Sequence, residues 1–232
     1  MVTIYIVAGI QTNENMFKPL IDTLRGRYGT EKGSVMIRIL HPYGEESHNK
    51  VKQLYQLGRD IQLYPEQASQ SSGGQRVRQM VKTLGAKDKL LFIGYGSGGP
   101  AAYHAAELLE KQDGCDVRFV VQVGSPKVPI GLQFRSRVGF LTRKGHGSEL
   151  EPSPWYGGWS HAKYRFTSHR YPGLLFNSRE QGRRFYAPQH ISAIDISGPE
   201  LNYFSPSEGK GTVSNLAKTM NVIWNWFQTA DK

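Results

Sequence analysis

Residues 90–109, LLFIGYGSGGPAAYHAAELL, place an apolar run directly before a glycine-rich turn and an alanine-rich run. The aliphatic run at 90–93 is typical of a buried strand, and the alanines and leucines after the turn are typical of a helix. Glycines between the two runs permit a tight reversal of the chain. The stretch therefore predicts a strand, a turn and a helix, the repeating unit of a parallel sheet.

The glycines in this turn indicate which residue lies at its tip. A nucleophile elbow, G-x-S-x-G, holds a reactive serine at the tip of a strand-to-helix turn, with a small residue two places before it and two places after it. Gly94 and Gly98 fit the two flanking places and put Gly96 at the tip. Since glycine has no side chain, this register leaves the turn without an attacking atom.

Two other interpretations of the turn stay open. If Ser97 is the nucleophile, Tyr95 takes the crowded place two residues before it and Gly99 the place two after it. The turn also fits G-x-G-x-x-G, the pattern of phosphate- and nucleotide-binding turns. The alternatives are thus a serine esterase that uses Ser97 and a phosphate or nucleotide binder that uses the turn at 94–99.

Length and composition narrow the class of protein. A chain of 232 residues is long enough for one domain with a substantial core, so we expect a single domain over 1–232. No run is apolar enough to span a membrane, and MVTIYIVAGI is typical of a strand rather than of a secretory signal. Cys115 is the single cysteine, which excludes an internal disulfide. We expect a cytoplasmic protein with no metal site and no cofactor.

Alternation of apolar and amphipathic runs predicts the fold class. The expected strands lie at 2–8, 35–40, 90–93, 118–123, 136–142 and 191–196, and the expected helices at 13–27, around 51–61, and at 75–84, 99–112 and 214–227. Strands that alternate with helices form a parallel sheet. We therefore predict an α/β fold with a mostly parallel sheet covered by helices on both faces.

Residues 143–190 interrupt this alternation and are predicted to form an irregular, lid-like insertion. They lie in the basic part of the chain, since residues 115–190 carry 12 Lys and Arg against 4 Asp and Glu. Aromatic side chains among cations stack on bases or sugars, pair with phosphates, or form a protein-binding surface. The predicted binding surface consists of Trp155, Tyr156, Trp159, Lys163, Arg165, Arg183 and Arg184. Its expected partner is a protein or a polyanion.

Three motifs resemble a known family. IGYGSGGPAA is similar to a nucleophile elbow, VVQVGSPKV at 120–128 is similar to a following strand that ends in G-[SQ]-P-[RK]-V, and AIDISGPELNYF at 193–204 is similar to a closing H-L-x-Y-F run. In this order they resemble the α/β-hydrolase superfamily, and most of all the fungal-type (class 3) lipases. The resemblance implies an α/β-hydrolase-like fold and an ancestry in ester hydrolysis.

The same resemblance leaves the catalytic triad vacant. Gly96 stands at the serine position, Glu200 at the histidine position, and Lys144 in the turn where the aspartate is expected. A triad needs a nucleophile, a base and an orienting acid, so the loss of all three argues against hydrolysis. The fallback pair is Ser97 with His146, because both follow strands at the edge where α/β sheets place their sites.

The oxyanion hole is better preserved than the triad. Its donors would be the amide of Ser97 and an amide near Ile10 and Gln11. A pocket for a carbonyl or small anion can thus persist without an attacking group. The sequence therefore favours a non-catalytic binding or regulatory protein over an enzyme.

Overall fold

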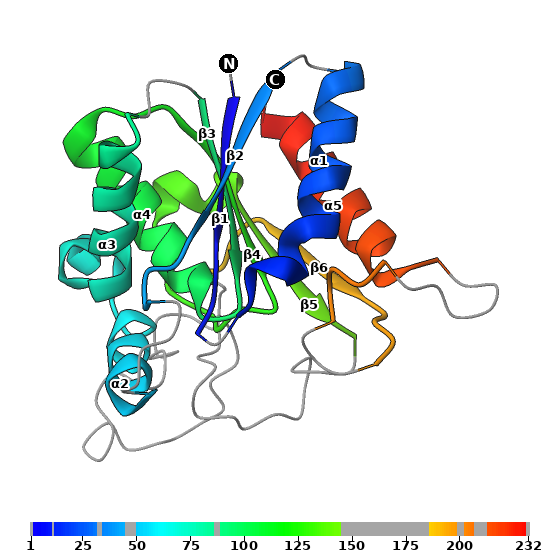
Figure 1. Cartoon of the computed structure of the whole chain (residues 1–232). Coiled ribbons are helices and arrows are strands. Elements are labelled where there is room, and N and C mark those ends of the chain that lie inside the picture. Colours follow the sequence, from blue (N-terminus) through cyan, green and yellow to red (C-terminus); the bar gives the residue numbers. More distant parts are fainter. Residues whose placement is uncertain are drawn as a thin grey trace.

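A computed structural model describes residues 2–10, 12–31, 34–44, 50–85, 89–144, 186–198, 202–206 and 213–230. In these residues six parallel strands form one sheet in the order β2-β1-β3-β4-β5-β6 (Figure 1). The strands are β1 Val2–Val7, β2 Val35–Leu40, β3 Lys89–Tyr95, β4 Val117–Val123, β5 Val138–Arg143 and β6 His190–Ile194. The predicted α/β class with a parallel sheet is confirmed.

Helices and short 3-10 turns connect the strands. The helices are α1 Lys18–Glu31, α2 Lys50–Asp60, α3 Ser72–Thr83, α4 Gly98–Asp113 and α5 Asn215–Ala230, and the 3-10 turns are η1 Glu14–Phe17, η2 Pro65–Gln70 and η3 Leu132–Arg137. Local sequence explains where several begin and end. Asn13 caps η1 by accepting a hydrogen bond from Asn15 N–H, Ser71 caps α3 by accepting one from Gly74 N–H, and Gly114 ends α4 in a left-handed conformation.

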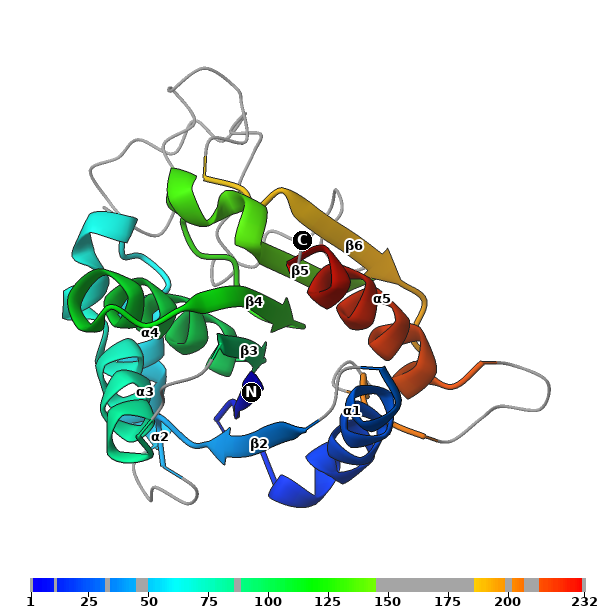
Figure 2. The same ribbon diagram turned by 90° about the horizontal axis from the view of Figure 1, so that it is seen from above.

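The central strands are buried on both faces, because alternate side chains of each strand pack into two different hydrophobic clusters. Ile4 and Ile6 of β1 pack with residues of α1 and α5, whereas Tyr5 and Val7 pack with residues of α3 and α4. Figures 1 and 2 show α1 and α5 on one side of the sheet and α3 and α4 on the other. The near-continuous apolar sequence of β1 follows from this arrangement, since neither set of side chains reaches water.

The elements differ from the predicted ones mainly at their ends. The helix expected from residue 13 begins as η1 and becomes α1 at Lys18, and η3 occupies the start of the strand expected at 136. Helix α2 forms as expected, but Val51, Leu54 and Tyr55 are 78%, 55% and 67% exposed. Its apolar spacing therefore marks a face that the described residues do not cover. No helix among them is long and apolar enough to cross a membrane.

Candidate functional site

The candidate site lies where the chain leaves β1 and β3. These strands are neighbours, and the chain continues from β1 into α1 but from β3 into α4, on the other side of the sheet. Such a switch point opens a crevice beyond the carboxyl ends of the strands, which is where α/β proteins bind their ligands. Here the two segments that meet at this edge of the sheet are the loop after Val7 and the turn at 96–97.

Close packing explains why the turn contains Gly94 and Gly98. A side chain added at Gly94 would meet the backbone of Gly99, 2.5 Å from its Cα, and one added at Gly98 would collide with the carbonyl of Val7. Only glycine permits these approaches between strand and helix backbones. These are the two places that an elbow centred on residue 96 requires to be small.

Gly96 differs from Gly94 and Gly98 in that it is not crowded by the surrounding backbone. Its φ of +53° is a left-handed conformation that side chains rarely adopt, yet a Cβ built on it has no atom within 4 Å. A side chain at the tip of the turn would therefore be strained by the backbone angle and not by crowding, whereas glycine adopts this angle freely. A left-handed backbone with open surroundings is suited to a side chain that projects from the tip of the turn, but the residue at this tip is glycine and has no side chain.

Ser97 turns its hydroxyl toward the loop after β1. Its Oγ accepts a hydrogen bond of 2.6 Å from Ile10 N–H, and it lies 3.2 Å from where a Cβ on Gly9 would be. Ser97 stands at the N-cap of α4 in a helical conformation, and its side chain makes no capping hydrogen bond. The Ile10 amide expected as an oxyanion donor is therefore already paired with a hydroxyl of the same chain.

The residues that follow β4 and β5 also form hydrogen bonds with backbone carbonyl groups. Ser125, which follows β4, is 3% exposed and its hydroxyl is 3.4 Å from the carbonyl oxygen of Gly94 and 3.3 Å from that of Val123. Lys144 follows β5, and its N–H donates to the carbonyl of Ile194. Neither position supplies a carboxylate for a triad.

An aromatic cluster packs around Tyr95, the residue that directly precedes the turn. The ring of Tyr95 packs against Phe17, Tyr203 and Phe204, with ring centres 5.3 to 6.4 Å apart. Burial raises the pKa of Tyr95 well above its ordinary value, with a further contribution from Tyr203. Tyr203 and Phe204 belong to the run compared with H-L-x-Y-F, so that run and the glycine turn meet in space although about a hundred residues separate them.

Several predicted site residues lie outside the described residues. The list comprises Gln11, His146, Glu200, Trp155, Tyr156, Trp159, Lys163, Arg165, Arg183 and Arg184. For Ser97 the fallback partner His146 and the vacant base position Glu200 thus remain predictions from the sequence. The described part of the site consists of Gly96, Ser97, Ile10 and Lys144.

A buried polar network that the sequence did not predict lies between α2, α3 and α4. Asp60 is fully buried and accepts hydrogen bonds from Tyr43 OH, Ser72 N–H and Gly73 N–H. His104 is also fully buried, and its Nε2 donates to the carbonyl oxygen of Asp60 at 2.8 Å. This network joins the N-terminus of α3 to its neighbours. The SSGG run that begins α3 is its visible signal, since serine caps helices and glycine permits close contact.

Comparison with protein-family models, with curated proteins and with solved structures finds no match to this chain. Any functional proposal therefore depends on the residues and their geometry.

Proposed function

We propose that this chain is a non-catalytic binding or regulatory protein on an α/β-hydrolase-like scaffold, with helices on both faces of its sheet. One observation carries the proposal. The tip of the strand-to-helix turn has the left-handed backbone and open surroundings of a reactive position, but its residue is Gly96. A nucleophilic mechanism needs an atom at this place, and glycine supplies none.

The conformation of Ser97 adds a second argument. Attack by Ser97 requires its hydroxyl to leave Ile10 N–H and to give its proton to a base. The bond to Ile10 also occupies a donor that an oxyanion would need. A serine in this orientation stabilises the junction of two loops, which favours a structural role for its hydroxyl.

The experiment is labelling of the purified protein with a fluorophosphonate probe, together with hydrolysis of p-nitrophenyl butyrate. We expect neither labelling nor turnover, because the accessible tip carries no hydroxyl. Ser97→Ala and Ser125→Ala are the matched variants, since both serines lie at the same edge of the sheet. Labelling that disappears in Ser97→Ala but persists in Ser125→Ala would make the protein a serine esterase and overturn the proposal.

For the partner, we propose an acidic protein or a polyanion that binds the basic, aromatic sequence at 143–190. Twelve cationic against four acidic residues at 115–190 supply the attraction. The test is fluorescence anisotropy with single-stranded RNA at low and physiological salt. If the partner is a polyanion, the affinity for RNA should fall steeply as the salt concentration rises. The double variant Arg183→Ala/Arg184→Ala should also bind RNA more weakly than the control double variant Lys18→Ala/Arg25→Ala, whose substitutions lie on α1. If RNA does not bind, or binds equally well to the two variants, a polyanion is excluded as the partner. An acidic protein then remains as the proposed partner.

A further inference from the structure

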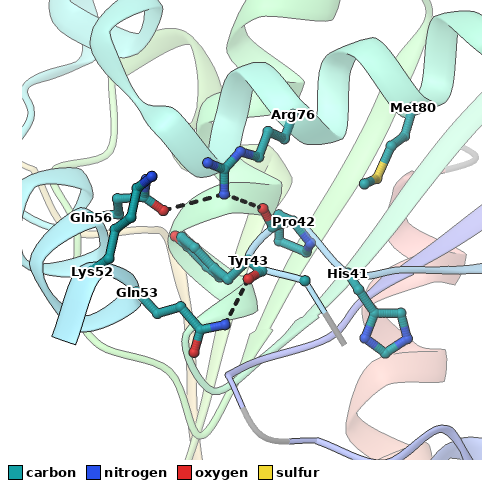
Figure 3. A pocket seen from close by; sticks show the side chains of 9 residues that line it. His41, Pro42, Tyr43, Lys52, Gln53, Gln56, Arg76 and Met80 are labelled. Carbon is teal, nitrogen blue, oxygen red and sulfur yellow. Dashed lines mark hydrogen bonds between the residues drawn. The ribbon is translucent and has the colours of Figure 1, made fainter. Parts of the chain in front are cut away.

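A hollow lies beyond the carboxyl end of β2, away from the glycine turn. It has a volume of about 350 Å³ and lies between the segment after β2, helix α2 and helix α3 (Figure 3). Its lining consists of His41, Pro42, Tyr43, Gly44, Lys52, Gln53, Gln56, Arg76 and Met80. This volume lies at the lower end of the range of small-molecule sites.

The lining is cationic. Arg76 and Lys52 contribute positive charge, and among the described residues none that lines the hollow is a carboxylate. Nη1 of Arg76 donates to the carbonyl oxygen of Pro42 at 2.9 Å and to Oε1 of Gln56 at 3.2 Å. These neutral acceptors orient the guanidinium without neutralising it, and its Nε and Nη2 make no hydrogen bond among the described residues. An arginine held in this way offers a two-pronged donor edge to an oxyanion.

Hydrogen bonds orient the side chains at the base of the hollow. Gln53 is only 5% exposed, and its Nε2 donates to the carbonyl of Tyr43 at 2.7 Å. The Tyr43 hydroxyl donates to Asp60, whose carboxylate also accepts two backbone N–H groups of α3. Asp60 is therefore satisfied behind the floor, and its carboxylate does not line the hollow.

His41 lines the hollow but takes part in another contact. Its Nε2 lies 3.3 Å from Oε1 of Glu14, and Figure 3 shows its ring directed away from Arg76. Pro42 and Met80 add apolar surface. The hollow thus combines an oriented cationic donor, one buried amide side chain (Gln53) and an apolar wall, which is the composition of a small-ligand site.

We propose that this hollow binds a small organic anion, whose carboxylate or phosphate pairs with Arg76 and whose carbon body contacts Pro42 and Met80. The site is separate from the turn at Gly96, so it stands or falls independently of the proposed function.

The test is calorimetric titration of the full chain with benzoate, phenyl phosphate and neutral benzamide. We expect saturable binding of at least one anion and none of benzamide. The tighter of the two anions identifies the group that the site prefers. Arg76→Gln should weaken binding at least about tenfold, since a charge-assisted hydrogen bond is lost. Arg59→Gln is the matched control, because it removes the same charge from α2 at a residue outside the lining.

Amide chemical-shift changes in the unaltered protein provide a readout that does not depend on the folding of a variant. They should centre on 41–44, 52–56 and 76–80. The proposal is overturned if neither anion binds, if benzamide binds as well as benzoate, or if Arg59→Gln weakens binding as much as Arg76→Gln. Shift changes elsewhere on the molecule would also overturn it.

Discussion

The backbone N–H of Ile10 donates to the hydroxyl of Ser97 across 2.6 Å, and this bond joins the segments that follow β1 and β3. These segments meet at the switch point of the sheet, where a ligand or substrate would enter. Ser97 therefore occupies with its own oxygen a donor that an oxyanion would use. Together with the vacant tip at Gly96, this bond supports the proposed function of a protein that binds rather than hydrolyses.

Replacement of Ser97 by alanine should loosen this junction. Ile10 N–H loses its acceptor, and a poorly paired amide in a partly buried position costs about 1–2 kcal/mol of unfolding free energy. Urea unfolding measures the loss, and amide hydrogen exchange should show Ile10 exchanging about tenfold faster. Unchanged exchange at Ile10 would mean that the bond contributes nothing in solution.

Replacement of Gly98 by alanine should be severe. The added Cβ collides with the carbonyl of Val7, so β1 and α4 must separate, which we expect to cost about 3 kcal/mol or more of unfolding free energy. The matched control is Gly58→Ala in α2, where a Cβ meets no atom within 4 Å and alanine should stabilise the helix by about 0.5–1 kcal/mol. Chemical denaturation compares the two, and similar effects would contradict the close approach.

Replacement of Gly96 by serine should be tolerated but should not create an esterase. The site has room for the new side chain, and the left-handed backbone costs about 1–2 kcal/mol of unfolding free energy. A hydroxyl at the tip still needs a base, and the sequence offers Glu200 at the expected histidine position. Turnover of p-nitrophenyl butyrate by Gly96→Ser would show that the remainder of a triad is intact.

His104 should make the protein sensitive to acid. Burial lowers the pKa of His104 below its ordinary 6.5, although the Asp60 carbonyl and nearby carboxylates oppose this shift. The unfolded chain therefore binds the proton first, so unfolding free energy falls as pH decreases from about 6.5 toward the lowered folded-state pKa. Urea unfolding between pH 8 and 5 measures this slope, and His104→Gln should flatten it. Parallel slopes in the two proteins would exclude His104 as the cause.

Local patterns determined the parts of this protein that depend on neighbouring residues. Continuous apolar runs in β1, β3 and β4 identify strands that are buried on both faces of the sheet, because each run is long, rich in branched side chains and bounded by turns. The glycines of 94–98 identify a tight strand-to-helix turn, because no other residue permits backbones to touch there. The α/β class and the glycine at the tip follow from such signals alone.

Contacts between distant segments were decided only by the tertiary structure. The pairing of Ser97 with Ile10, the contact of Tyr203 with Tyr95, and the burial of Asp60 beneath Tyr43 all join residues from different elements. The exposed apolar face of α2 shows the same limit, since helical spacing says which residues share a face but not what covers it. Sequence specified the elements because propensity and spacing are local, whereas the orientation of each polar side chain depends on which strands and helices become neighbours.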